Sequence, residues 1–263
     1  MQQPQGFIDP HQPYSVCKLV KSLYRLKQAP RAWFDCFASH LLTLGFQASL
    51  ADSSLFVRRT SDSLTYLLLY VDDITLTETH ASYIDCLISQ LKLRFDMTDL
   101  GPLRFFLGLE IAYSSHGISV HQSKYTKDVL TRFGMLSAKP CSTPIALSSA
   151  HTSSLCSDAD AKNYRSLVGA LHYLTFSRPN IAFAVSKLSQ HLHSPTDEHL
   201  VAAKRVLRYL RGSVGLGLIF QKGCCLDHSL RLTAYSDSDW AGDSNDRRST
   251  IGFVIFLGSS PIS

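Results

Sequence analysis

This sequence of 263 residues lacks several signatures by which common protein classes are recognised. It has no Cys-x-x-Cys pair, no Gly-x-Ser-x-Gly string and no glycine-rich phosphate loop, so neither a zinc site nor the corresponding hydrolases are indicated. No apolar run approaches the roughly 20 residues that cross a bilayer. The amino terminus also lacks the basic and apolar regions of a secretory signal peptide. We therefore expect no membrane association and no secretory leader.

Disulfide bonding is not indicated either. The seven cysteines are odd in number and scattered along the chain, rather than arranged at the spacings of a disulfide framework. Such a set is typical of proteins in a reducing compartment. We therefore expect the protein to act in one.

Charge is modest and unevenly distributed. Hydrophobic residues make up 45% of the chain and charged residues 18%, which is ordinary for one or two soluble globular domains. The net charge of +5 permits a nucleic-acid partner without establishing one. Between Lys18 and Arg31 there are five basic residues and no acidic one, with Tyr24 and Trp33 as neighbouring aromatics. This cluster is either a phosphate-binding surface or a solvated face.

The spacing of apolar residues predicts an α+β fold with antiparallel strands. Helices are expected near residues 30–45, 81–95, 123–135, 163–175, 179–191 and 195–211. Strands are expected near residues 54–59, 64–71, 74–77, 104–112, 118–122, 216–220, 230–236 and 250–257. The strand at 64–71 is almost wholly apolar, which is typical of a central strand covered on both faces. Ser194 as a cap and Asp197 in a capping box would begin the last helix.

Two adjacent carboxylates, Asp72 and Asp73, follow the apolar strand at 64–71. Burying an unpaired carboxylate is costly, so a divalent cation would give a reason for the pair. Mg²⁺ in proteins takes one or two carboxylates together with substrate phosphates, and nucleotidyl transfer uses two such ions about 3.5–4 Å apart. Neighbouring side chains of a regular strand point to opposite faces, so only a turn lets both carboxylates approach one site. The alternative interpretation is a solvated turn.

Three segments carry a resemblance to a known family. Tyr70–Asp73 reads Tyr-Val-Asp-Asp, Lys27–Trp33 reads Lys-Gln-Ala-Pro-Arg-Ala-Trp, and Phe106–Glu110 reads Phe-Leu-Gly-Leu-Glu. In this order they resemble the catalytic string, the L-K-Q-x-P-R-x-W segment and the primer grip of the reverse transcriptase in copia-type LTR retrotransposon Pol polyproteins. The resemblance runs along nearly the whole chain.

The resemblance implies an RNA-directed DNA polymerase that acts on a primed RNA or DNA template with deoxynucleoside triphosphates. Asp72 would be the stronger and Asp73 the weaker ligand of Mg²⁺, or of Mn²⁺ in its place. Gln28 would lie beside the incoming nucleotide and Tyr70 near the primer terminus. The implied substrate-binding residues are Lys27, Gln28, Arg31 and Tyr70.

The implied primer grip consists of Leu107, Gly108 and Leu109, and on spacing alone an ordinary hairpin is favoured there. Residues 235–242 and 247–253 resemble the first two strands of the family's RNase H domain, in which Asp237 fits the first catalytic carboxylate. RNase H also uses two metal ions. The alternative is a solvated acidic loop that contains Asp237, Asp239 and Asp243.

Two departures from the family pattern bear on activity. Arg25 stands where the family has a glycine, a residue that can supply a positive φ. The chain also starts after the family's first polymerase aspartate and stops before the remaining RNase H carboxylates, so we expect a fragment truncated at both ends. We hypothesise that such a chain polymerises poorly or not at all. The alternative is a non-catalytic relic that at most binds nucleic acid.

The domain organisation implied by the resemblance has four parts. Residues 1–136 would hold part of the polymerase palm and fingers and a thumb-like segment, and 137–162 a linker. Residues 163–222 would form a helical connection, and 229–263 an incomplete RNase H-like hairpin. Lys204, Arg208 and Arg211 are predicted to share one helix face, either solvated or near the template–primer duplex. The family acts inside the cell, in a cytoplasmic virus-like particle or the nucleus.

Overall fold

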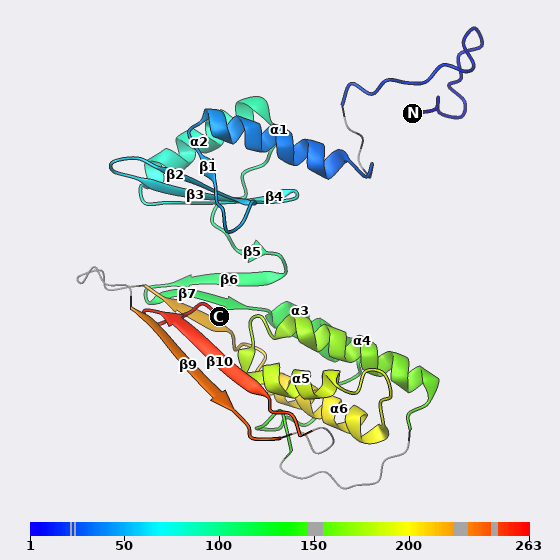
Figure 1. Ribbon diagram of the computed structural model, residues 1–263, viewed down its shortest axis with the longest axis vertical. Helices are drawn as coiled ribbons and strands as arrows, with labels where there is room; N and C mark the ends of the chain where they lie inside the picture. The colour runs from blue at the N-terminus through cyan, green and yellow to red at the C-terminus, as the bar shows by residue number, and fades with distance from the viewer. Residues whose placement is uncertain (22, 24, 147–154, 223–230, 243–246) are drawn as a thin grey trace. The chain divides into compact units, whose positions relative to one another are not determined.

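The computed structural model describes the chain except for residues 22, 24, 147–154, 223–230 and 243–246 (Figure 1). Tyr24, Asp243 and part of the predicted linker therefore lie outside the described residues. The chain divides into two compact units, Met1–Gly101 and Pro102–Ser263. Each unit has its own hydrophobic core. Mixed helices and antiparallel sheets confirm the predicted α+β class.

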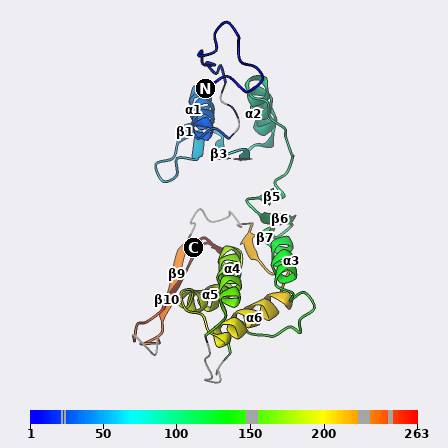
Figure 2. The same cartoon turned by 90° about the vertical axis from the view of Figure 1, so that its right-hand side faces the viewer.

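The first unit contains one four-stranded antiparallel sheet and two helices. The strands are β1 (Gln47–Ala48), β2 (Leu55–Arg59), β3 (Leu64–Tyr70) and β4 (Asp73–Glu78), and they lie in that order across the sheet. The helices α1 (Ala29–Thr43) and α2 (Ala81–Arg94) cover one face of the sheet (Figures 1 and 2). Apolar side chains from both helices and from β2 and β3 form the core between them.

The bounds of α1 follow from its terminal residues. Pro30 stands in the first turn, where its missing N–H is no loss, and Gly45 follows the helix with a φ of +84°. Phe37 and Leu41 are fully buried, whereas Trp33 and Leu44 pack against the same core from its edge. The prediction of a helix near residues 30–45 is confirmed.

Strand β3 lies in the middle of its sheet, but only one of its faces is covered within the first unit. Thr65, Leu67 and Leu69 are buried, whereas Tyr66 and Tyr70 on the other face are exposed. The expectation that both faces are covered is therefore wrong for this unit. The reason is that α1 and α2 pack on the same face. The apolar run therefore reflects one core face and an outer face made of two leucines and two tyrosines.

The second unit contains two antiparallel sheets and a group of helices. One sheet has the order β5 (Phe105–Phe106), β6 (Leu109–Ser114), β7 (Gly117–His121) and β8 (Leu218–Gln221). The other has the order β11 (Ser260–Pro261), β10 (Ile251–Leu257) and β9 (Leu232–Ser238). Strand β8 pairs with β7 although it lies about 100 positions later in the chain, with Gly117 opposite Gln221. The helical segment therefore lies between two strands that are neighbours in one sheet.

Four α-helices of the second unit share one core. They are α3 (Ser123–Arg132), α4 (Asp158–Leu174), α5 (Ala182–Ser189) and α6 (Asp197–Arg211), with a short 3₁₀ helix, η1 (Pro179–Ile181), before α5. Tyr164 of α4 is fully buried, and its hydroxyl donates to the carbonyl of Leu188 at 2.7 Å. Burial raises the pKa of Tyr164 to about 12, so this phenol stays a neutral donor.

The start of α6 differs from the prediction. Thr196, not Ser194, is the N-cap, and the partner in the capping box is His199, not Asp197. The Thr196 N–H donates to Nδ1 of His199 at 3.0 Å. An imidazole nitrogen thus takes the place that a carboxylate or amide oxygen ordinarily has in this motif.

Basic side chains of α6 hold the segment 136–143, which we call the α6 strap. Arg211 Nε donates to the carbonyl of Leu136 at 2.6 Å, and Arg208 Nε donates to the carbonyl of Lys139 at 2.8 Å. Arg205 bonds the Thr143 hydroxyl at 2.8 Å. The apolar face of the helix is buried as predicted. The start of the predicted linker is therefore bound along α6, and two of the predicted basic residues have backbone acceptors.

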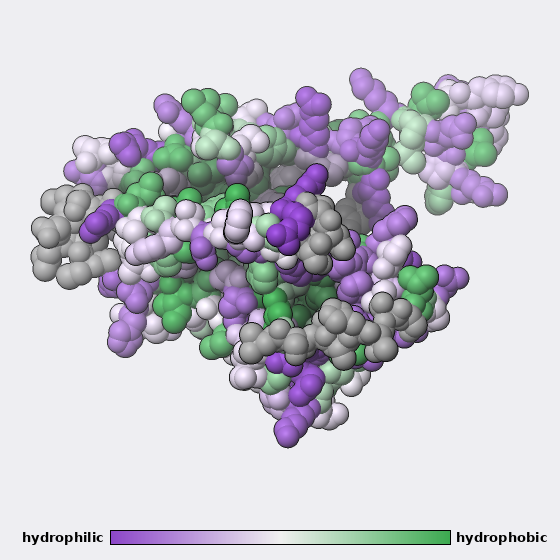
Figure 3. All heavy atoms as spheres, turned by 60° about the horizontal axis from the view of Figure 1, so that its bottom comes forward, coloured by the Kyte–Doolittle hydropathy of each residue, from purple (hydrophilic) through white to green (hydrophobic). Residues whose placement is uncertain are grey.

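Exposed apolar side chains are gathered on one face of the β9–β10 pair, where Leu232, Ile251, Phe253 and Leu257 lie. On the face shown in Figure 3, apolar residues alternate with hydrophilic ones and form no continuous band. Single exposed apolar residues are normal on protein surfaces. Within the described part of the chain, no helix has the length and apolar character that crossing a membrane requires.

The capping box formed by Thr196 and His199 should make the stability of the fold depend on pH. Burial, together with the stacked ring of His191, lowers the pKa of His199 below its ordinary value of 6.5. The folded state therefore binds this proton less readily than the unfolded state, so the stabilisation is present above pH 6.5 and is lost as pH falls towards the lowered pKa. Thermal unfolding between about pH 7.5 and pH 5.5 should show this loss.

The variant His199→Gln should flatten that dependence, because a Gln oxygen accepts the Thr196 N–H without titrating. The matched control is His193→Gln, at an exposed position just before the helix. A wild-type pH dependence that persists unchanged in His199→Gln would show that the cap is not its source.

Candidate functional site

The two predicted metal ligands lie at a tight turn between β3 and β4. Tyr70 pairs with Asp73 across the hairpin, so Val71 and Asp72 form a two-residue connection. Val71 has a φ of +51°, and Asp72 does not have a positive φ. A positive φ at the first connecting residue alone is the pattern of a type II′ turn, in which this position ordinarily takes glycine. The predicted tight connection is confirmed, with Asp73 as the first residue of β4.

The turn is strained at Val71. A β-branched residue at positive φ is a genuine conformational outlier, because its Cβ crowds the backbone. Such strain costs about 1–3 kcal/mol and persists only where surrounding contacts hold it. Outliers of this kind occur preferentially at functional sites.

A contact from α1 holds this turn. The indole Nε1–H of Trp33 donates to the carbonyl oxygen of Val71 at 3.0 Å. The indole is itself oriented by Phe37 and Phe95, whose ring centroids lie 5.4 Å from that of Trp33. The structure therefore connects the segment Lys27–Trp33 to the Asp72 turn through one side chain.

The carboxylates of Asp72 and Asp73 are exposed and available to a ligand. Among the described residues, no ion pair or side-chain hydrogen bond to either carboxylate is formed. Two free carboxylates suit the part of a Mg²⁺ shell that proteins supply, with phosphates and waters completing it. In the described part of the chain, no group of three or more His, Cys, Asp or Glu side chains is arranged to hold a metal ion.

The predicted nucleotide-side residues lie at the start of α1. Gln28 is the N-cap residue but its side chain makes no capping bond, and Lys27 is exposed. Arg31 is exposed and lies 3.9 Å from Asp35 one turn later, an ion pair of little energetic weight. Arg25 adopts a φ of +69°, the conformation that the family's glycine would supply without strain. The side chains of Lys27, Gln28 and Arg31 are thus all exposed to solvent.

The predicted primer-grip residues form the turn between β5 and β6, in the second unit. Phe106 pairs with Leu109, and the two connecting residues Leu107 and Gly108 have φ of +48° and +75°. Positive φ at both positions is the pattern of a type I′ hairpin turn. The hydroxyl of Tyr173, from α4, donates to the carbonyl of Leu107. A Cβ at residue 108 would overlap that hydroxyl, so any other residue there would have to displace the end of the Tyr173 side chain and bear the strain of a positive φ.

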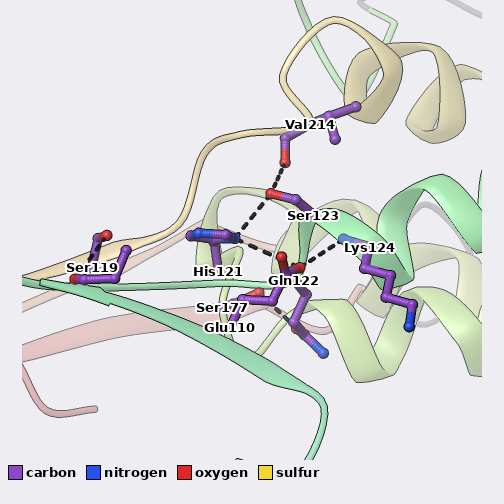
Figure 4. Close-up of polar contacts among 9 residues, drawn as sticks. Glu110, Ser119, His121, Gln122, Ser123, Lys124, Ser177 and Val214 are labelled. Atoms are coloured by element: carbon purple, nitrogen blue, oxygen red, sulfur yellow. Dashed lines mark hydrogen bonds and ion pairs between the residues drawn. The ribbon is translucent and has the colours of Figure 1, made fainter. Parts of the chain in front are cut away.

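A polar cluster joins this hairpin to the helices (Figure 4). Glu110 of β6 accepts the backbone N–H of Lys124 at 2.7 Å and lies 3.7 Å from His121. The Ser123 hydroxyl donates to the carbonyl of Val214 at 3.1 Å. Beside it, the buried Ser177 hydroxyl donates to the side-chain oxygen of Gln122 at 2.6 Å. The cluster fixes the hairpin on the helical core.

Glu110, His121 and Ser123 include the residue types of a catalytic triad, but their geometry does not make one. The Ser123 hydroxyl and the Glu110 carboxylate both lie against Nδ1 of His121, at 2.9 Å and 3.7 Å. A triad needs the nucleophile and the acid on opposite ring nitrogens. The arrangement is therefore structural, which agrees with the absence of hydrolase motifs from the sequence.

Asp237 lies in β9, opposite Gly252 of β10, and is exposed. Its carboxylate accepts the N–H of Ser238 at 2.9 Å. The neighbouring Asp239 accepts the N–H of Thr250, which makes it a cap for the connection to β10. Within the described residues, these carboxylates are not gathered into a group that could hold a metal.

Two residues at these turns were not predicted as functional. The helical spacing of Trp33 is typical of a core residue, and that spacing gives no sign of its bond to Val71. Tyr173 lies in a helix 66 positions away from Leu107, and no local pattern marks it. Both roles depend on contacts between distant segments.

Comparisons with known proteins support the family resemblance. The family described as "Reverse transcriptase (RNA-dependent DNA polymerase)" matches residues 1–147. The retrovirus-related Pol polyprotein from transposon RE1 of Arabidopsis thaliana is 46% identical over all of this chain and 18% of its own length. That from transposon TNT 1-94 of Nicotiana tabacum is 38% identical over all of this chain and 20% of its own length. The chain therefore spans about a fifth of these relatives.

A shorter relative covers a similar span. The putative transposon Ty5-1 protein of Saccharomyces cerevisiae is 32% identical over all of this chain and 85% of its own length. No solved structure matches the chain.

The Tyr173 contact gives a prediction about the β5–β6 turn. The variant Tyr173→Phe should destabilise the turn by about 1 kcal/mol, because the Leu107 carbonyl loses its donor. Gly108→Ala should cost more, since it adds strain at positive φ and overlaps the hydroxyl. In the Tyr173→Phe background there is no hydroxyl for the new Cβ to overlap. Gly108→Ala should therefore lower the stability of the turn by less in that background than in the wild type. Amide hydrogen exchange of the turn measures each effect, and equal costs in both backgrounds would contradict the contact.

Proposed function

Because the chain belongs to the reverse transcriptase family of copia-type retrotransposon Pol polyproteins, we propose that it carries the metal-binding turn of an RNA-directed DNA polymerase. The observation that carries the proposal is the exposed Asp72–Asp73 pair on a hairpin turn held by Trp33. The pair has no ionic partner within the described residues and presents its charge to solvent. That arrangement suits a cation that arrives together with a triphosphate.

The proposed reaction is nucleotidyl transfer to a primer on an RNA or DNA template. Mg²⁺ or Mn²⁺, when bound, would lower the pKa of the primer hydroxyl and offset the charge of the leaving pyrophosphate. Asp72 would supply the stronger ligand and Asp73 the weaker one. Tyr70, which is exposed and pairs with Asp73 across the hairpin, would contact the primer end.

The remaining assignments are part of the same proposal. Lys27, Gln28 and Arg31 would contact the incoming nucleotide, since they are accessible at the start of the helix that bonds the turn. Leu107, Gly108 and Leu109 would grip the primer, at a turn of type I′ geometry. Asp237 would belong to an RNase H-like portion formed by β9 and β10. We propose that the protein acts inside the cell, on nucleic acid.

The subdomain names are proposals too. The sheet and helices of the first unit would be palm and finger elements, and α3 a thumb-like segment. Helices α4 to α6 would form the connection. In this scheme the α6 strap would stiffen the connection, because three arginines attach it to one helix.

A second candidate function is nucleic-acid binding without catalysis. The exposed basic residues at Lys18, Lys21 and Lys27 favour it, because they lie in a stretch without acidic neighbours. Phosphate contacts of this kind give affinity that is independent of sequence and falls with salt. The two functions differ in their dependence on a metal ion. Binding to the phosphate backbone of a nucleic acid needs no carboxylate of the protein, whereas nucleotidyl transfer does.

The test measures metal binding and primer extension separately. Asp72→Asn removes charge at constant shape, so the dissociation constant for Mn²⁺ should rise about tenfold or more, with a smaller rise for Asp73→Asn. The matched control is Asp62→Asn, at the exposed turn between β2 and β3. Any extension of a DNA primer on an RNA template, which we expect to be weak at most, should be lost with Asp72→Asn.

Wild-type Mn²⁺ affinity in Asp72→Asn would refute the metal site. Template–primer binding without extension, equal in wild type and Asp72→Asn, would instead support the second function.

A further inference from the structure

The peptide bond between Val71 and Asp72 is the centre of the β3–β4 turn. Types I′ and II′ differ mainly in the orientation of this central peptide, and a flip of it also reverses the sign of φ at the following residue. The turn has the type II′ pattern, with φ positive at Val71 only. The flipped alternative would move the Cα–Cβ direction of Asp72 and hence its carboxylate.

The intrinsic conformational preference of valine does not favour the observed orientation of the central peptide. The first position of a type II′ turn is suited to glycine, because a Cβ there crowds the backbone. Valine is β-branched and so among the residues least suited to it. Val71 has a positive φ in both forms, so its strain does not by itself select the observed turn. A contact from outside the turn can make that selection.

Trp33 supplies that contact at the relevant atom. Its Nε1–H donates at 3.0 Å to the oxygen of the Val71 carbonyl, which belongs to the central peptide itself. If the peptide flipped, this oxygen would point away and the indole would lose its acceptor. The indole has little freedom to follow, because it packs against Phe37 and Phe95 of the core.

We propose that Trp33 is a positioning residue, whose indole hydrogen bond holds the central peptide of the β3–β4 turn and thereby sets the direction of the Asp72 carboxylate. The consequence for metal binding rests on the proposed function, whereas the turn orientation itself does not. The proposal extends the role of the Lys27–Trp33 segment from contacting nucleotide to fixing the carboxylate turn.

The first experiment uses the unaltered 263-residue chain. Its two tryptophans give two indole N–H resonances in a ¹⁵N–¹H spectrum, and Trp240, which is 95% exposed, serves as the internal reference. The Trp33 proton should exchange with solvent at least about tenfold more slowly than that of Trp240, since it is hydrogen-bonded. Equal exchange rates would overturn the proposal.

The second experiment asks whether the hydrogen bond acts on the carboxylate. Trp33→Phe keeps an aromatic ring and removes the donor, so the dissociation constant for Mn²⁺ should rise about 3- to 10-fold. The amide signal of Asp72 should shift in the same variant. The control Phe46→Leu loses packing in the same core at a residue with no ring contact to Trp33, and it should leave Mn²⁺ affinity and the Asp72 signal unchanged. A loss of affinity in Phe46→Leu equal to that in Trp33→Phe would show a general packing effect and overturn the proposal.

The third experiment tests the strain argument. Val71→Gly makes the type II′ turn intrinsically favourable. In that background, Trp33→Phe should weaken Mn²⁺ binding by less than about twofold. An equal loss in both backgrounds would mean that the indole does not act through the turn, and would overturn the proposal.

Failure of the two proposals is distinguishable. If Asp72→Asn binds Mn²⁺ as the wild type does, the metal site fails. Indole exchange and the Asp72 amide shift, which need no metal, then decide whether Trp33 positions the turn.

Discussion

The hydrogen bond from the Trp33 indole to the Val71 carbonyl is the contact on which the candidate site depends. It acts on a peptide that has an unfavourable conformation for valine and that directly precedes the first of two exposed carboxylates. The indole that donates this bond is oriented by its packing against Phe37 and Phe95. The conformation of the turn therefore depends on packing in the core. A core residue thereby determines where a solvent-facing charge points.

The same physical solution occurs at the turn between β5 and β6. There the Leu107 carbonyl, also at a non-glycine residue with positive φ, accepts a bond from the Tyr173 hydroxyl. In each unit an aromatic side chain from a helix holds a strained hairpin turn by its carbonyl. Strained turns cost stability and persist where tertiary contacts over-determine them. Both turns contain residues that the family resemblance marks as functional, so we infer that local rigidity is maintained there.

Several polar features serve the chain's own architecture. The arginines of α6 attach the α6 strap. Glu110, His121 and Ser123 join the hairpin to the helices instead of forming a triad. The buried guanidinium of Arg178 likewise bonds both the carbonyl and the hydroxyl of Ser213 at 2.7 Å, and burial lowers its pKa. Several charged residues of this chain are therefore engaged in its own structure.

The sequence by itself determined the α+β class, most helices and strands, and the tight connection at Asp72, because periodicity and turn residues act over a few positions. It also determined the family, through three motifs in order. Only the tertiary structure decided that β3 has an open face, that β8 pairs with β7, and that Thr196 rather than Ser194 caps α6. It also decided the roles of Trp33 and Tyr173. Each of these depends on segments that meet in space, and such contacts leave no periodic or local trace in the chain.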